Sequence, residues 1–215
     1  MADGYHHGNL RAAVLEKAAE VIGREGPHAL SLRSLAVGLG VSHTAPRHHF
    51  GSREGVLNAL ATEGFRELAD RLRAGRESGG DFLDTGVEYV RFATDRPAHF
   101  DVMFTPGLLS ADDEELNAAR TAAFDELRTG VGSLAEEGRE VEDAAAALVA
   151  GWSIVHGVAT LALTGNLDRS GLRSLFEDGD LLAITRRSAG LLFGPRTPGS
   201  SGGDRIPESG SPRPE

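Results

Sequence analysis

The chain of 215 residues contains no cysteine, one tryptophan and two tyrosines. Without cysteine there is no disulfide framework and no thiolate zinc site. The opening residues, MADGYHHGNLR, lack the apolar core of a secretory signal peptide. Hydrophobic residues make up 40% of the chain, which is enough for a buried core. We therefore expect a globular, cytoplasmic protein of one large or two small domains.

Common catalytic and phosphate-binding motifs are also missing. There is no nucleophile elbow, no GxxxxGK[ST] phosphate loop, no HExxH pair and no EF-hand spacing. The acidic run from Asp112 to Glu115 is typical of a helix start rather than of a metal cage. We predict no enzymatic activity, no cofactor and no metal site. A histidine-dependent metal or hydrolytic enzyme is the weakest alternative.

Charge is absent from one long stretch, Ala144 to Leu167, which is long enough to span a bilayer. Its many small residues gain little from hydrocarbon, His156 falls near its middle, and no cluster of Lys or Arg flanks it. A helix that is apolar all round also suits a bundle core or a subunit interface. We interpret the stretch in that second way and expect no membrane partner.

The net charge of −10 argues against nucleic-acid binding until it is divided along the chain. Residues 1–76 contain ten Lys and Arg against eight Asp and Glu, and the remainder contains twelve against twenty-four. Between residues 41 and 53 there are two arginines, three histidines and no acid. The positive charge is therefore concentrated in one short N-terminal segment.

That segment lies in a pattern of two short helices joined by a tight turn. Ser31 is suited to cap the first helix, and Gly40 can adopt the left-handed conformation that ends it. Ser42 is suited to cap the second helix. Pro46 removes an early hydrogen bond if Ser42 is the cap, and costs little if the helix begins two residues later. This arrangement predicts a helix-turn-helix motif, whose second helix enters the major groove of DNA.

Apolar residues recur at helical spacing through most of the remaining chain, and no strand alternation persists. One helix is expected before the motif and a longer one after the Ser52 cap. Further helices are expected from Asp81, over about 112–134, over about 142–164 and over about 179–193. Residues 76–80 have the composition of a joint, and the chain after Gly194 is rich in Pro, Gly, Ser and charge. The fold class is therefore all-α.

The motif residues resemble those of the tetracycline-repressor (TetR) family of bacterial regulators. The matching residues are Leu35-Ala36, Gly40-Val41-Ser42, His49-Phe50, Arg53-Glu54 and Leu57. Farther on, the Trp-His-Gly motif formed by Trp152, His156 and Gly157 resembles one branch of that family. The resemblance implies an all-helical dimer with an N-terminal DNA-binding head and a C-terminal ligand-binding body. The chain departs from the family at Arg47, where a phosphate-contacting tyrosine is common, but arginine can meet a phosphate by charge.

Candidate DNA contacts gather on the second helix of the motif. Thr44 and Arg47 are the main candidates for base or phosphate contacts, and nearby histidines can donate to phosphate or bond a base edge. The resemblance adds His49, because the equivalent histidine contacts the DNA backbone. Arg53 opposes a helix dipole, which favours a phosphate partner. The predicted set is Ser31, Ser42, His43, Thr44, Arg47, His48, His49 and Arg53.

His156 is the polar residue of the apolar stretch, and several aromatic residues of the body fall in segments expected to pack near it. An apolar aromatic cavity with few polar groups is typical of a ligand site. The predicted ligand-binding set is Phe92, Phe100, Met103, Phe104, Trp152 and His156. The alternatives are an ordinary core with a hydrogen-bonded histidine, and a dimer interface made possible by Gly151 and Gly157.

These observations together predict a DNA-binding transcriptional regulator, a homodimeric repressor released from a palindromic operator by a small apolar ligand. We expect a three-helix helix-turn-helix head over residues 1–53 and a connecting helix and joint over 54–80. A helical-bundle ligand-binding and dimerisation body follows over 81–194, with a disordered tail over 195–215. The alternative is a small-molecule-binding helical protein whose head does not bind DNA sequence-specifically.

Overall fold

The computed structural model describes residues 7–105, 107–135, 141–177 and 179–194. Within these residues the chain forms ten α-helices and two short 3-10 helices, and no strand, as the sequence predicts. The segment 195–215, which we expect to be disordered, lies outside the described residues.

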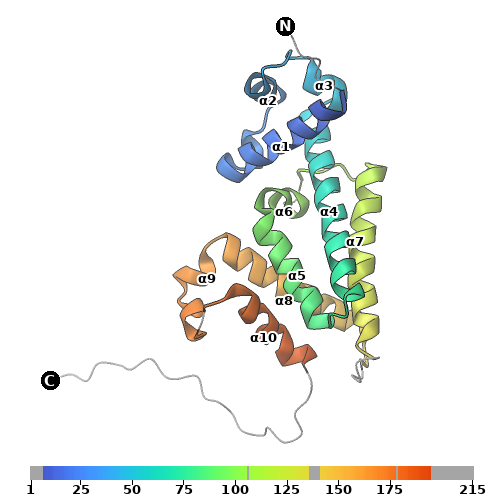
Figure 1. The fold of residues 1–215 in the computed structure, drawn as a ribbon, viewed down its shortest axis with the longest axis vertical. Coiled ribbons are helices and arrows are strands. Elements are labelled where there is room, and N and C mark those ends of the chain that lie inside the picture. Colours follow the sequence, from blue (N-terminus) through green and yellow to red (C-terminus); the bar gives the residue numbers. More distant parts are fainter. Residues whose placement is uncertain (1–6, 106, 136–140, 178, 195–215) are drawn as a thin grey trace, which may run out of the picture.

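The head lies at one end of the molecule (Figure 1). Its elements are α1 (His7–Glu25), η1 (Pro27–Ala29), α2 (Leu32–Leu39) and α3 (Ala45–Phe50). The Ser31 side chain accepts a hydrogen bond from the Ser34 N–H at 3.0 Å, and Gly40 ends α2 with φ at 66°. Both predicted caps of α2 are therefore confirmed.

The start of α3 decides between the two possibilities left open by the sequence, a cap at Ser42 or a start two residues later. The helix begins at Ala45, after Thr44, which has no side-chain capping hydrogen bond. Had Ser42 been the cap, Pro46 would lack the N–H that must bond to the Ser42 carbonyl. Beginning at Ala45 puts Pro46 in the first turn, where the backbone N–H groups have no intrahelical partner in any case.

The helix α4 (Arg53–Glu77) runs from the head into the body beside α7 (Figure 1). Ser52 caps it, accepting from the Gly55 N–H at 3.0 Å. With 25 residues the helix is about 37 Å long. Its first turns bury Leu57 and Leu60 in the head, and its later turns bury Phe65 and Leu68 in the body. One hydrophobic core therefore continues through α4 from head to body.

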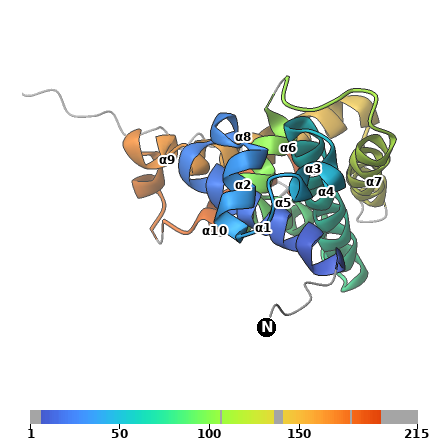
Figure 2. The ribbon, with the colours of Figure 1, turned by 90° about the horizontal axis from the view of Figure 1, so that it is seen from above.

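The body is a bundle of helices around the lower part of α4. Its elements are α5 (Phe82–Asp95), α6 (Pro97–Phe104), α7 (Glu114–Ser133), α8 (Ala144–Leu163), α9 (Asn166–Arg169), η2 (Leu172–Leu175) and α10 (Leu181–Phe193). Seen from above, the head lies over α4, α5 and α6, with α7 and α9 at opposite edges (Figure 2). The helix α6 contacts both α1 and α4, so it lies where head and body meet.

An ion-pair cluster attaches α10 to the start of α5. Asp81 and Asp84 form a capping box, and Arg186 of α10 binds both carboxylates, with its Nη2 2.8 Å from Asp81 Oδ2. Burial alone would raise the pKa of Asp81, but the backbone N–H of Asp84 and the Arg186 guanidinium outweigh burial and lower the pKa. The C-terminal helix is thus held against the body by charge as well as by apolar contact.

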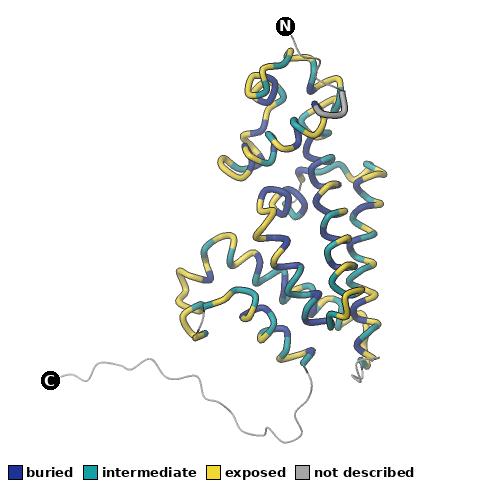
Figure 3. The backbone as a smooth tube through the Cα atoms, viewed as in Figure 1, coloured by how far each residue is buried: buried dark blue, intermediate teal, exposed yellow. Residues whose placement is uncertain are grey.

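The uncharged stretch forms α8, and one helix of this length and apolar composition is present among the described residues. Only 22% of its most apolar window is buried within the chain. Exposed residues are frequent along α8, α9 and α10, whereas α4 and α5 are largely buried (Figure 3). A single chain therefore leaves much of this apolar helix uncovered.

Candidate nucleic-acid interface and ligand pocket

The turn before α3 and its first residues form an exposed polar surface on the head. The exposed members of the predicted DNA-binding set there are Ser42, His43, Thr44, Arg47 and His48. The hydroxyls of Ser42 and Thr44 lie 3.2 Å apart and bond to each other. These side chains point away from the head core, as side chains that meet a nucleic acid must.

Arg47 is unusual among the arginines of this chain. Within the described residues, only Arg33 and Arg47 of the arginines have no hydrogen bond, no ion pair and no aromatic ring beneath them. Both are exposed, one on α2 and the other on α3. Their guanidinium groups are therefore available to an external anion without breaking an existing contact. The sequence prediction omitted Arg33. This residue stands out only when the structure shows that the other described arginines have partners within the chain.

Arg53 has internal partners instead. Its Nη2 donates to the Pro27 carbonyl at 2.6 Å and its Nε to the Leu30 carbonyl at 3.0 Å. The carbonyl oxygens of Pro27 in η1 and of Leu30 directly after it thus provide the negative partner that the start of α4 lacks. These contacts account for an arginine at the start of α4 without any phosphate partner. They also attach η1 to α4.

Replacing Arg53 by alanine is expected to destabilise the head by about 1.5–3 kcal/mol, because two carbonyl oxygens lose charged donors. Urea unfolding measures this loss. Arg33→Ala is the matched control, since Arg33 has no partner to lose and its removal should change stability by less than about 0.5 kcal/mol. Equal stability of the two variants would contradict the structural role of Arg53.

The two remaining predicted DNA-contact residues, Ser31 and His49, are also partly engaged within the head. Ser31 is exposed, but its hydroxyl already caps α2. The His49 ring is half-buried, with ring centroids 5.7 Å from His48 and 6.4 Å from Phe50. Both residues therefore support the local structure of the head.

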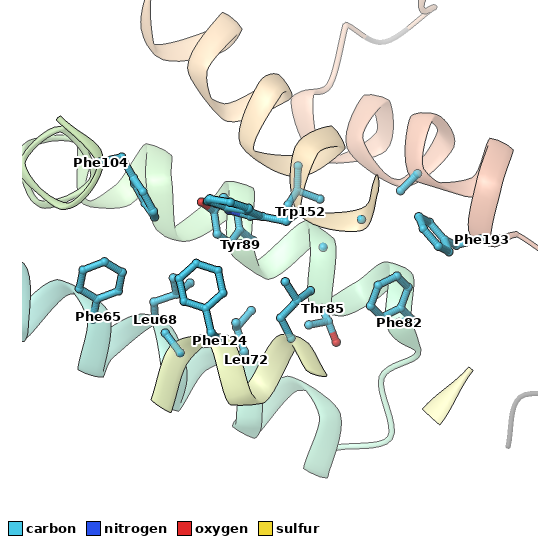
Figure 4. A pocket seen from close by; sticks show the side chains of 16 residues that line it. Phe65, Leu68, Leu72, Phe82, Thr85, Tyr89, Phe104, Phe124, Trp152 and Phe193 are labelled. Carbon is cyan, nitrogen blue, oxygen red and sulfur yellow. The ribbon is translucent and has the colours of Figure 1, made fainter. Parts of the chain in front are cut away.

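A narrow apolar pocket lies in the body, between α4, α5, α7, α8, α10 and the end of α6 (Figure 4). Phe65 and Phe104 lie toward one end, and Phe82 and Phe193 at the other, with ring centroids 5.7 Å and 5.1 Å apart respectively. No charged side chain lines it. The free space is only about 40 Å³, room for no more than a few water molecules. A ligand of ordinary size enters only if the surrounding side chains move apart.

Three polar side chains from α5 and α8 form a hydrogen-bonded chain beside the pocket. The Trp152 Nε1–H donates to the Tyr89 hydroxyl at 3.2 Å, and that hydroxyl lies 2.9 Å from His156 Nδ1. Burial raises the pKa of Tyr89 and lowers the pKa of His156, so both groups are held in their neutral forms. Because the described residues offer the Tyr89 proton no other acceptor, we assign it to the bond with His156 Nδ1. His156 is thus a hydrogen-bonded histidine in this structure, as in one of the alternatives weighed from the sequence.

The six predicted ligand-binding residues separate in the structure. Phe104 and Trp152 line the apolar pocket, whereas Phe100, Phe104 and His156 line a different groove. Phe92 is fully buried under the Arg71 guanidinium, and Met103 packs on Gly64 of α4. Neither Phe92 nor Met103 lines these two spaces, because both side chains belong to the core. The prediction missed five aromatic residues of the pocket: Phe65, Phe82, Tyr89, Phe124 and Phe193.

Gly151 and Gly157, the two glycines of the predicted close helix approach, differ in whether they line the pocket. Gly151 lies in the pocket wall, where an added Cβ would come within 3.1 Å of the Phe82 ring. An added Cβ at Gly157 would meet open space, so Gly157 does not line the pocket. No group of three or more His, Asp or Glu suited to a metal ion occurs within the described ranges.

Comparison with known proteins identifies both parts of the chain. Residues 14–60 match the family described as bacterial regulatory proteins, tetR family. Residues 82–179 match the family described as tetracyclin repressor-like, C-terminal domain. An uncharacterised HTH-type transcriptional regulator of Mycobacterium tuberculosis is 27% identical over 184 residues, which cover 84% of this chain and 81% of that protein.

Solved structures share the fold. A protein of unknown function from Rhodococcus sp. RHA1 has 29% identity and a TM-score of 0.71, covering 87% of this chain and 97% of the other. AibR, solved with isovaleryl coenzyme A and operator DNA, has 15% identity and a TM-score of 0.66, covering 87% and 100%. The family matches fall on the helix-turn-helix head and on the body with its pocket, and the chain belongs to the TetR family of DNA-binding bacterial transcriptional regulators.

Proposed function

We propose that this regulator is a cytoplasmic, homodimeric repressor that leaves a palindromic operator when a small, neutral, apolar ligand opens the body pocket. The DNA-binding part rests on two exposed arginines of the helix-turn-helix motif, Arg33 and Arg47, which have no partner among the residues that the structure describes. We include Arg33 with the residues predicted from the sequence. We also assign the chain to the family branch with the Trp-His-Gly motif, supported by the shared hydrogen bonding of Trp152 and His156 to Tyr89.

DNA recognition in this proposal depends on the short helix α3. The exposed side chains of Thr44, Arg47 and His48 would face the major groove, where hydroxyl, guanidinium and imidazole groups can bond base edges. Arg33 and the hydroxyls of Ser31 and Ser42 would meet the phosphate backbone. We keep the domain division proposed from the sequence as a division of functions, in which all DNA contacts lie before residue 54.

The ligand in this proposal is neutral and apolar because the pocket offers no charged partner. AibR was solved with a coenzyme A thioester, but a charged nucleotide portion would find no counter-charge inside this pocket. Since the closed space is about 40 Å³, an entering ligand must separate α7, α8 or α10 from α4 and α5. The helix α4 also carries the head, so a ligand that favours the opened body can change the spacing of two heads.

The second subunit would cover the uncovered apolar faces of α8 and α10. Large apolar side chains on these helices are exposed in the single chain, among them Val149, Leu191 and Leu192. Soluble monomers rarely expose continuous apolar surface of this kind. A dimer would also bring two α3 helices to the two halves of a palindrome.

Selection of bound sequences from random duplex DNA tests the DNA-binding proposal. A regulator of this kind should enrich one palindrome and bind it with a strong salt dependence. The alternative, a ligand-binding helical protein with a head that does not read DNA, would enrich no sequence. Metal analysis of the purified protein tests the alternative of a histidine-dependent metalloenzyme, because a stoichiometric metal would favour it.

The effector pocket predicts a change in Trp152 fluorescence. A panel of neutral aromatic and aliphatic compounds should contain ligands that shift this emission and weaken operator binding, because Trp152 lines the pocket. Operator DNA must weaken the binding of such a ligand by the same factor. Replacing Ala123 by valine should abolish the response, since Ala123 lines the small space, at a cost of about 1–3 kcal/mol in stability.

The matched control is Ala119→Val, one turn away on α7. Ala119 is buried, but it does not line the pocket. It should lose similar stability and keep the ligand response. An effector that binds Ala123→Val as tightly as the wild type would exclude this pocket.

A further inference from the structure

A second and roomier cavity lies between the head and the body. It is a groove of about 450 Å³ between the C-terminal end of α1, the helix α6 and the C-terminal half of α8. Its floor includes the buried side chains of Ile22 and Phe100, and its rim includes the exposed side chains of Asp101 and Thr160. Unlike the narrow apolar pocket, this groove has room for a small molecule without movement of the helices.

His156 supplies a hydrogen-bond donor to this groove. The Tyr89 hydroxyl accepts from Trp152, and His156 Nδ1 is the only acceptor for its own proton within the described residues. We therefore assign the ring proton of His156 to Nε2. Within the described part of the chain, Nε2 has no hydrogen-bond partner, and the residue lines the groove. The neutral imidazole therefore offers one N–H to an acceptor placed there.

Asp101 supplies the single charge of the groove. Its Oδ1 accepts from the Thr105 hydroxyl at 3.0 Å, and no cationic side chain of the described residues pairs with it. No other charged residue of the described ranges lines the groove. An anionic molecule would therefore meet an unpaired carboxylate, whereas a cation would neutralise it.

Aromatic and apolar side chains complete the walls. Phe100 and Phe104 have ring centroids 4.9 Å apart, and the Phe100 ring stacks on the His156 ring at 5.3 Å. Ile22 and Leu163 contribute aliphatic surface from the head and from α8. These surfaces fit a flat or short aliphatic body rather than a highly polar one.

We propose that the groove between α1, α6 and α8 is a second ligand site, which takes a small organic cation with an apolar body and one hydrogen-bond acceptor. The cation pairs with Asp101, the acceptor receives the His156 Nε2–H, and the body lies against Phe100. The occupant touches the head through Ile22 and Gly23 and the body through α6 and α8. It therefore fixes the head relative to the body from a position outside the apolar pocket, with which the groove shares only Phe104.

Three probes of one shape but different charge test the site: tyramine, tyrosol and 3-(4-hydroxyphenyl)propionate. Each carries a phenol oxygen as acceptor, and the side chain is cationic, neutral and anionic respectively. Ligand-detected NMR titration of the full-length protein should show that tyramine binds most tightly, tyrosol less tightly and the anion least tightly. Asp101→Asn should weaken tyramine binding by about twofold to fivefold, as expected for an exposed ion pair, and leave tyrosol binding unchanged.

Gly23→Leu fills the groove from the head side. The nearest atom to an added Cβ is Ala98 Cβ at 4.0 Å, so the substitution is accommodated at its first atom. It should abolish binding of all three probes. Gly132→Leu is the control, because an added Cβ there meets nothing within 4 Å and Gly132 lies on α7, away from the groove. Ala123→Val should retain tyramine binding, because it fills only the apolar pocket.

Several results would overturn the second site. Binding of the anion as tight as that of tyramine, or no saturable binding of any probe, would do so. So would wild-type binding by Gly23→Leu, or loss of binding in Ala123→Val. Should Gly23→Leu fail to fold, the exposed substitution Asp101→Asn decides, because equal binding of tyramine before and after it contradicts the proposal. None of these outcomes depends on operator binding.

Discussion

Replacing Arg47 by alanine is expected to weaken operator binding by about 1–3 kcal/mol per half-site. Arg47 is exposed on α3 and has no hydrogen-bond or ion-pair partner within the described residues. Its removal therefore leaves no described group of the protein without a hydrogen-bond partner. The lost free energy of binding then comes entirely from lost contacts with DNA. In a dimer the loss occurs at both half-sites.

Titration of operator and scrambled duplexes at several salt concentrations measures this effect. If Arg47 reads a base, specificity is relaxed; if it meets a phosphate, affinity falls uniformly and the salt slope decreases. Arg91→Ala is the control, because Arg91 is exposed on α5 and pairs only with Glu88. Arg73 and Arg76 share Glu126 and should likewise contribute little. Unchanged operator affinity in Arg47→Ala would move the recognition role to Thr44 and His48.

A charged residue at Leu192 is expected to dissociate the dimer. Leu192 is 64% exposed in the single chain and lies on α10. Burying a leucine contributes about 1.5–3 kcal/mol, and Leu192→Glu would both remove this contribution in each subunit and bury an unpaired carboxylate. Sedimentation at micromolar concentration should then show a monomer with greatly weakened operator binding. Leu163→Glu, on α8, should act in the same direction.

Val37→Glu is a closely matched control for Leu192→Glu. Val37 is 65% exposed, so the same charge replaces an equally accessible apolar side chain, but on α2 of the head. It should leave the sedimentation coefficient unchanged. A wild-type protein that sediments as a monomer, or a Leu192→Glu protein that remains dimeric, would contradict the proposed interface.

Features that depend on neighbouring residues were predictable from the sequence. The caps at Ser31, Gly40 and Ser52 require only local hydrogen bonds or a local backbone conformation, and all three are confirmed. For α3 the sequence left two starts open, and the structure has the later one, because the restriction at Pro46 decides where this helix begins. The helical class followed from periodicity, which the burial of one face enforces.

Features that join distant residues were not predictable in this way. The partners of Arg53 are carbonyl oxygens more than twenty residues away, so the sequence could not distinguish a structural arginine from a DNA-binding one. The pocket aromatics Phe82 and Phe193 come from the start of α5 and the end of α10. Their meeting depends on how Arg186 attaches α10 to α5, which periodicity does not encode.

The small free volume of the apolar pocket affects how fast the regulator responds to its ligand. A pocket of about 40 Å³ admits a ligand only in the minor fraction of molecules whose helices have separated. The apparent affinity is then reduced by that fraction, and association at high ligand concentration is limited by the rate of opening rather than by diffusion. The delay before derepression would thus be a property of the protein's own core packing. Ligands of quite different affinity would then release the operator after similar lag times.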